Sequence, residues 1–109
     1  MIRIMLVDDH ELIRQGLRRA FDRSGDFEVV GEAGTLTAAR VVAGEVSPTV
    51  VVTDVRLPDG SGLDLARELR NQHPELGIVV LTMYAGDDTL FAALDAGASA
   101  LVSKDAPAD

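Results

Sequence analysis

Short apolar runs recur along the chain, and their spacing constrains the fold more than any other feature. Each run is rich in β-branched residues and is bounded by polar residues or glycine, which is typical of strands. Apolar and polar positions do not alternate within the runs, which indicates strands buried on both faces, as in parallel sheets. Five such strands are predicted, over residues 2–7, 27–30, 50–53, 78–81 and 100–102.

Segments with a helical spacing of apolar residues separate these strands. Their apolar stripes are Ile13, Leu17, Ala20 and Phe21; Leu36, Ala39, Val42 and Ala43; Leu65 and Leu69; and Leu90 and Leu94. The expected helix ends are Thr35 and Ser61 as N-caps, Asp87 and Asp88 at the start of the fourth helix, and stops at Ser24-Gly25, Gly44, His73-Pro74 and Gly97. Strand and helix therefore alternate four times, which predicts right-handed crossovers and a doubly wound α/β sheet.

Size and charge limit what such a domain could do. The chain has 109 residues, so we expect residues 1–109 to form one domain, and it has no cysteine for disulfides or thiolate chemistry. Its formal net charge of -8 has the wrong sign for binding nucleic acid or an anionic membrane. The first apolar run reaches Asp8 too soon for a signal peptide or a membrane span. We therefore expect a cytoplasmic protein that itself contacts neither nucleic acid nor a membrane.

The last residues look like the beginning of a further helix. Asp105 has the chemistry of an N-cap and Pro107 suits a first helical turn, yet the sequence ends at Asp109. We expect a truncated fifth helix and a sheet face that lacks part of its cover. Exposed apolar area on that face predicts self-association, as a homodimer or larger species, at high concentration.

Polar residues follow several of the predicted strands at the point where each ends. Asp8 and Asp9 follow the first strand, Asp54 the third, Thr82 the fourth, and Ser103 with Lys104 the fifth. In an open parallel sheet, ligands bind beyond the carboxyl ends of the strands. These residues are therefore the candidates for chemistry, although any single one would also fit a solvated loop.

The motifs around these positions resemble the receiver domain of bacterial two-component response regulators over essentially the whole chain. The most similar subfamily is the LuxR/NarL type, whose receivers precede a helix-turn-helix domain. The resemblance implies a flavodoxin-like, five-stranded parallel sheet in the order 2-1-3-4-5, and an output domain that this chain does not contain. The residues that carry it are Val7-Asp8-Asp9-His10 with Leu12, Arg14, Gly16 and Leu17, then 54–60, Leu81-Thr82, Ala96-Gly97-Ala98 and Lys104-Asp105.

This strand order predicts a metal site. Neighbouring strands are about 4.8 Å apart, so the ends of the first and third strands bring Asp8, Asp9 and Asp54 into one acidic pocket. Three such carboxylates repel one another, and oxygen ligands favour Mg²⁺. The resemblance implies that Asp9 and Asp54 ligate the ion directly, Asp8 through water, and Arg56 through its backbone carbonyl.

The resemblance also implies a phosphoryl transfer. Asp54 corresponds to the phospho-acceptor, which takes a phosphoryl group from a phosphohistidine on a sensor histidine kinase. We expect the Thr82 hydroxyl to contact a phosphoryl oxygen, and the ammonium of Lys104, the sole lysine, to reach it from two strands away. Such a domain catalyses its own phosphorylation and slow hydrolysis and is not a conventional multiple-turnover enzyme.

Phosphorylation is expected to act as a switch. In the family, an aromatic residue three positions before the lysine follows the threonine inward, but here that position is Leu101. Leucine has neither a hydroxyl nor a flat ring, and Tyr84 could compensate for it. The expected switch residues are therefore Thr82, Leu101 and Tyr84.

Two other functions compete with this interpretation. A phosphatase of the haloacid-dehalogenase type also uses an aspartate nucleophile, but it needs a second acid two residues later, where this chain has Arg56. An atypical receiver could act unphosphorylated as a protein-interaction module, which Leu101 favours and the intact acid set disfavours. His10 and His73 receive no site role, and the faces with Arg67, Glu68 and Arg70 are interpreted as solvated helix surface.

Overall fold

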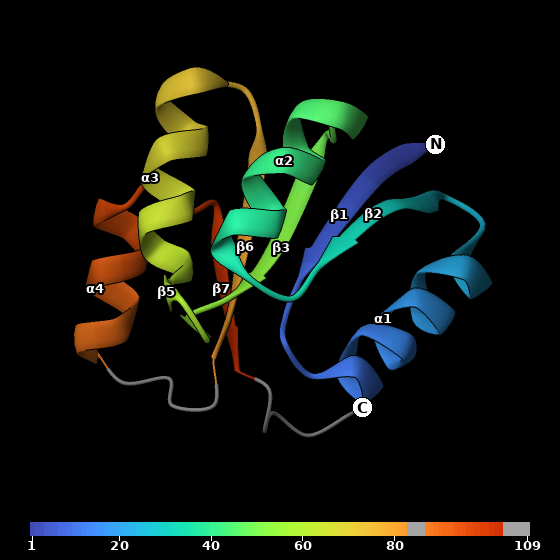
Figure 1. The fold of residues 1–109 in the computed structure, drawn as a ribbon, viewed down its shortest axis with the longest axis horizontal. Helices are drawn as coiled ribbons and strands as arrows, with labels where there is room; N and C mark the ends of the chain where they lie inside the picture. Colours follow the sequence, from blue (N-terminus) through green and yellow to red (C-terminus); the bar gives the residue numbers. More distant parts are fainter. Residues whose placement is uncertain (83–86, 104–109) are drawn as a thin grey trace.

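In the computed structural model, residues 1–82 and 87–103 are described (Figure 1). The strands are β1 (Ile2–Val7), β2 (Phe27–Ala33), β3 (Val50–Asp54), β4 (Arg56–Leu57), β5 (Gly60–Ser61), β6 (Gly77–Thr82) and β7 (Ala100–Ser103). Five of them form one parallel sheet in the order β2-β1-β3-β6-β7, while β4 and β5 form a separate antiparallel pair. With that short hairpin set aside, this is the predicted order 2-1-3-4-5, so the doubly wound α/β fold is confirmed.

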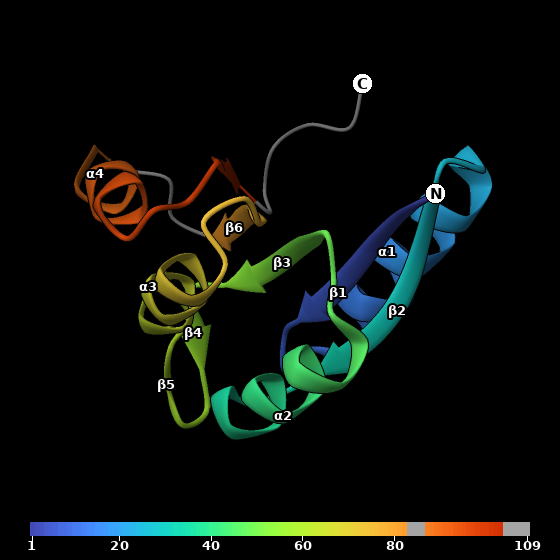
Figure 2. The ribbon, with the colours of Figure 1, turned by 90° about the horizontal axis from the view of Figure 1, so that it is seen from above.

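Helices cover both faces of the sheet. They are α1 (Glu11–Ser24), α2 (Leu36–Val46), α3 (Gly62–Gln72) and α4 (Asp87–Asp95). Seen along the strands, α1 lies on one face and α2, α3 and α4 lie on the other (Figure 2). Among the residues described, no helix is both long and apolar enough to cross a membrane.

Strand β1 is buried on both of its faces from Ile4 to Val7, as its unbroken apolar run predicts. In β1, Met5 and Val7 pack into the larger core under α2, α3 and α4, whereas Ile4 and Leu6 pack into a smaller core with residues of α1. All four side chains are 1% exposed or less. Successive side chains of a strand point to opposite faces, so a run without polar residues requires a covered sheet on both sides.

The predicted helix starts at α2 and α3 are confirmed by their caps. The Thr35 hydroxyl accepts a hydrogen bond of 3.1 Å from the Ala38 amide, and the Ser61 hydroxyl accepts one of 3.1 Å from the Leu63 amide. Each side chain satisfies one of the amides that a helix N-terminus leaves without an intrahelical partner. The stop after α1 is confirmed as well, because Gly25 has a φ of 75°.

Two elements, α2 and β2, run two and three residues past their predicted ends, whereas the other extensions are of one residue. The expected stop of α2 at Gly44 is wrong, because the helix continues to Val46. It ends at Ser47, which adopts the left-handed conformation and donates its amide hydrogen bond to the Ala43 carbonyl. In β2 the pairing with β1 continues to Ala33. A glycine inside a helix costs only about 1 kcal/mol, so it does not by itself end one.

The buried face of α4 differs from the predicted one. Ala93 and Ala96 are buried, whereas Leu94 and Phe91 are 53% and 66% exposed. A small side chain, Ala93, is therefore buried here, and the prediction is wrong for Leu94, while the side chain of Leu90 lies outside the described part of the chain. On α1, no residue is fully buried, so its apolar stripe packs at the edge of the smaller core rather than inside it.

The charged faces of α3 are not simply solvated, which corrects the prediction for Glu68 and Arg70. The Arg40 guanidinium donates two hydrogen bonds of 2.9 Å to the Glu68 carboxylate and so connects α2 to α3. These bonds hold the pKa of Glu68 below its ordinary value. The Arg70 guanidinium donates to the carbonyls of Gly97 and Pro74, at 2.9 and 2.7 Å, and connects α3 to the end of α4.

The start of α3 packs directly against the end of β3. A Cβ atom added at Gly62 would lie only 1.8 Å from the Asp54 carbonyl oxygen. The Gly62 amide also donates a hydrogen bond of 2.7 Å to the Val55 carbonyl. Only glycine lets the start of α3 approach the backbone of Asp54 this closely. Gly62 therefore holds the backbone at the end of β3 in place.

Candidate functional site

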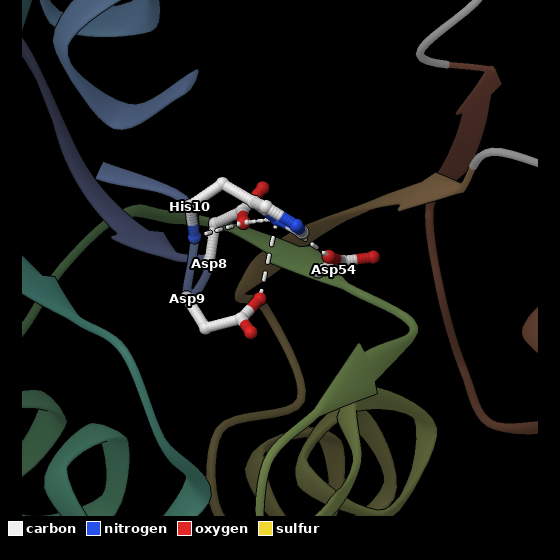
Figure 3. Close-up of side chains that lie close together, drawn as sticks. All are labelled: Asp8, Asp9, His10 and Asp54. Carbon is white, nitrogen blue, oxygen red and sulfur yellow. Dashed lines mark hydrogen bonds and ion pairs between the residues drawn. The ribbon is translucent and has the colours of Figure 1, made fainter. Parts of the chain in front are cut away.

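Three carboxylates meet at the carboxyl ends of β1 and β3 (Figure 3). Asp8 and Asp9 follow β1, and Asp54 is the last residue of β3, which lies beside β1 in parallel register. Asp8 and Asp54 are buried, with 2% and 6% of their surface exposed, whereas 36% of the Asp9 side chain is exposed. The structure therefore brings together the three acids that the strand order predicts.

His10 also lies in this cluster, although the sequence analysis gave it no site role. Its Nδ1 atom lies 2.8 Å from Asp8 Oδ1, 3.2 Å from Asp9 Oδ1 and 3.9 Å from Asp54 Oδ2. One atom from each of the four side chains lies within 4.8 Å of the other three. As expected, His10 precedes α1 as its N-cap, but its side chain makes no cap hydrogen bond and turns to the carboxylates instead.

Two further predicted site residues, Thr82 and Leu101, belong to β6 and β7, which follow β3 in the sheet order. Thr82 ends β6, is buried, and follows the residue that pairs with Asp54. Leu101 in β7 is half-buried and packs against the larger core. Lys104 and Tyr84 lie outside the described residues.

A cavity of about 340 Å³ opens beside the acidic cluster. Its walls include Asp9, Asp54 and Thr82 together with Arg56 of the β4–β5 hairpin. A larger cavity of about 560 Å³ lies near the C-terminal ends of α2 and α3 and includes none of these acids. Because the polar residues converge on the smaller cavity, we assign the candidate site there.

The donor set of this cavity fits a hard divalent cation. Two of the three carboxylates are buried within a few ångströms of each other, and like charges held that close require protons or a cation for neutralisation. Mg²⁺ is bound through one or two carboxylates and keeps several waters, which the open and partly exposed side at Asp9 allows. The His10 nitrogen is the one donor in the cluster that does not match this preference.

The loop beside the site is held by a contact that sequence reasoning missed. Asp59, in the turn between β4 and β5, accepts hydrogen bonds from the amides of Leu36 and Thr37, at 2.7 and 3.1 Å. It therefore caps the N-terminus of α2 from 23 residues away. These amide bonds hold the pKa of Asp59 below its ordinary value. The run Leu57-Pro58-Asp59-Gly60, within the family-like stretch 54–60, was the available signal, but only the fold supplies the partner.

The fold and the position of the acids define a class of protein. In the sheet, β2 lies on one side of β1 and β3 lies on the other, so the strand order changes direction at β1. Doubly wound sheets bind ligands at such a point, beyond the carboxyl ends of the strands, and the site lies there, at the ends of β1 and β3. Residues 4–109 match the family described as response regulator receiver domain. The chain belongs to this family and is the receiver domain of a two-component response regulator.

Particular relatives agree with the LuxR/NarL-type resemblance. The chain is 43% identical over 105 residues to the DNA-binding transcriptional activator DevR/DosR of Mycobacterium tuberculosis, an alignment that covers 96% of this chain and 48% of that protein. A LuxR-family response regulator from Aurantimonas sp. SI85-9A1 has a similar structure, with a TM-score of 0.89 and 38% identity over 95% of this chain and 74% of that one.

A second solved structure is the isolated receiver domain of RcsB from Salmonella enterica serovar Typhimurium, determined in the presence of the phosphomimetic BeF3⁻. It has a TM-score of 0.89 and 28% identity over 97% of this chain and 79% of that one. The chain spans about half the length of the curated relatives it matches. These similarities extend through the described sheet and helices, so they support the fold and the family together.

Proposed function

We propose that this chain is a phospho-acceptor domain in which Asp54 receives a phosphoryl group in the presence of Mg²⁺. The observation that carries the proposal is the meeting of buried Asp54 with Asp8 and Asp9 at neighbouring strand ends, beside an open cavity. A buried carboxylate next to two others is a costly arrangement for stability alone, and it is useful where a cation and a transferring phosphoryl group are to be bound.

Four residues would hold the ion. Asp9 and Asp54 would ligate it directly, Asp8 would contact it through water, and Arg56 would contribute its backbone carbonyl. When bound, Mg²⁺ neutralises charge on the phosphoryl oxygens during transfer. The exposed Asp9 carboxylate suits its role because the ion must enter the site from solvent. The buried Asp8 carboxylate suits its role because it stays fixed at the end of β1.

The donor would be a phosphohistidine on a sensor histidine kinase. An Asp54 carboxylate oxygen attacks phosphorus, so that a P–O bond forms while the P–N bond to the donor imidazole breaks. The released imidazole nitrogen takes a proton from solvent, which completes the transfer. The Thr82 hydroxyl would donate to a phosphoryl oxygen, and Lys104 would supply a positive charge there. Attack of water on the acyl phosphate later regenerates the carboxylate and inorganic phosphate.

The phosphorylated domain would act as a switch for a transcriptional output. A relative that shares 43% identity is described as a DNA-binding transcriptional activator, which supports DNA binding through an output domain that follows a receiver of this kind. Within the receiver, Thr82, Leu101 and Tyr84 would connect the site to the surface that includes α4 and β7. We also propose a cytoplasmic location and homodimer formation.

A direct experiment tests the acceptor. The chain is incubated with acetyl phosphate and Mg²⁺, and intact mass spectrometry measures the addition of one phosphate. The label should be lost in Asp54→Asn and when EDTA removes the metal, and it should be retained in the surface control Asp22→Asn. Circular dichroism confirms that the variants remain folded. A label that persists in folded Asp54→Asn would show that another residue is the acceptor.

A further inference from the structure

Arg14 in α1 connects three parts of the chain next to the acidic cluster. Its guanidinium donates a hydrogen bond to the Asp8 carbonyl, and its Nε atom lies 3.3 Å from Glu32 Oε1 on β2. Arg18, one helical turn further along α1, pairs with the other oxygen of the Glu32 carboxylate through its Nη2 atom. The Arg14 and Glu32 side chains are 21% and 25% exposed, so both lie largely within the protein.

The carbonyl that Arg14 holds belongs to the peptide group between Asp8 and Asp9. A peptide group is planar, so fixing its oxygen restricts the orientation of the whole unit and of the Asp9 Cα atom attached to it. The direction in which the Asp9 carboxylate points is therefore set partly by the Arg14 bond. An exposed side chain such as Asp9 has little packing of its own to orient it.

The end of β2 leaves room for this guanidinium. A Cβ atom added at Gly34 would lie 3.3 Å from Arg14 Nη1, 3.8 Å from the Asp9 Cα atom and 3.9 Å from the Asp8 carbonyl oxygen. Gly34 thus borders both the guanidinium and the turn that it holds. An arginine suits this place because one arm of its planar, charged group donates to the Asp8 carbonyl while Nε forms an ion pair with the Glu32 carboxylate, whereas a lysine has a single compact ammonium.

We propose that Arg14, oriented by Glu32, is a positioning residue that presents the Asp8 and Asp9 carboxylates to Mg²⁺. The inference rests on the proposed function, because it assumes that these carboxylates bind the ion. Arg14 itself touches neither the ion nor the phosphoryl group. Loss of its bond lets the Asp8–Asp9 turn sample other orientations, so the metal affinity falls while the acceptor Asp54 keeps its place at the end of β3.

The test measures Mg²⁺ affinity by isothermal titration calorimetry in the wild type and in Arg14→Met, Arg14→Lys, Glu32→Gln and Arg18→Met. Residues that orient metal ligands typically change affinity by about 10- to 100-fold when replaced. We expect roughly a tenfold rise in Kd for Arg14→Met, a similar rise for Arg14→Lys and a smaller rise for Glu32→Gln. Arg18→Met removes a neighbouring partner of Glu32 but no bond to Asp8, so its Kd should remain near that of the wild type.

Phosphorylation by acetyl phosphate as a function of Mg²⁺ concentration gives a second readout. A positioning role predicts that Arg14→Met needs more Mg²⁺ for half-maximal rate but approaches the wild-type rate at saturation. Thermal unfolding shows which variants are folded, and Arg14→Lys serves if Arg14→Met is not. An unchanged Kd in a folded Arg14 variant, or an equal rise in Arg18→Met, would overturn the inference. Failure of the wild type to bind Mg²⁺ would instead refute the proposed function.

Discussion

At the scale of single residues, His10 occupies the point on which the three carboxylates converge. Its Nδ1 atom is within 2.8 to 3.9 Å of an oxygen from each of Asp8, Asp9 and Asp54. A cation bound by the same oxygens would need much of the same space. The ring is 58% exposed, so it has room to swing outward into solvent when a cation binds.

We expect His10→Ala to bind Mg²⁺ more tightly than the wild type. A cation that binds the Asp8 carboxylate must break its hydrogen bond with His10, which stabilises the metal-free protein by about 1 kcal/mol net. His10→Ala has no such bond to break, so its Kd for Mg²⁺ should be about fivefold lower. Calorimetry at a single fixed pH measures the difference, with His73→Ala at the exposed end of α3 as the matched control. Weaker binding in His10→Ala would instead identify the imidazole as a ligand.

At the scale of elements, one side chain joins the loop beside the site to the helix next to it. Asp59 lies in the turn between β4 and β5 and receives the Leu36 and Thr37 amides at the N-terminus of α2. A carboxylate is favoured at this end of a helix by both the unpaired amides and the helix dipole. Because Arg56 lies in the same hairpin and lines the cavity, the cap also steadies one wall of the candidate site.

This cap predicts an acid-dependent part of the stability. The folded-state pKa of Asp59 is lowered, mainly by the Leu36 amide, so its contribution is fully present above the unfolded carboxyl pKa of about 4 and is lost as the pH falls through the lower folded value. Asp59→Asn should therefore reduce Tm at pH 7, and this difference should shrink toward pH 3. Thermal unfolding at several pH values checks the effect, with Asp22→Asn as control. A difference in Tm that does not vary with pH would contradict it.

At the scale of the whole molecule, the two faces of the sheet are covered unequally by the described helices. Three helices lie on one face and α1 lies on the other (Figure 2). On the α1 side, Val50 and Val79 are only half-buried. Val102 lies next to Leu101 in β7, and Leu101 packs into the core under α4, so strand alternation directs Val102 toward the α1 side. It is 44% exposed there.

We therefore expect the chain to self-associate through this face at high concentration. Burial of apolar side chains such as Val102 against a second copy is favourable at about 25 cal/mol per Å². Sedimentation velocity across a wide concentration range should show a rising sedimentation coefficient, which Val102→Lys should diminish. Val41→Lys, which changes an exposed valine on α2 instead, should leave association unchanged. A purely monomeric profile at every concentration would count against the homodimer.

Local pattern was enough to predict some features of this protein. The β-branched runs identify all five sheet strands, and Thr35 and Ser61 identify two helix starts, because strand burial and capping depend on neighbouring residues in the chain. Local pattern was misleading for α4, where Leu94 is exposed and Ala93 is buried, because the choice of face depends on what the helix packs against.

Short-range periodicity and polarity are sufficient to predict the alternation of strands and helices and the acids at the strand ends. The strand order entered through resemblance to a family. Three contacts become visible only in the folded chain: the His10 ring lies among the carboxylates, Arg14 donates to the Asp8 carbonyl, and Asp59 caps α2. The physical reason is distance along the chain: Arg14 and Glu32, like Asp59 and Leu36, are many residues apart. No local pattern specifies which distant groups the folded chain brings into contact.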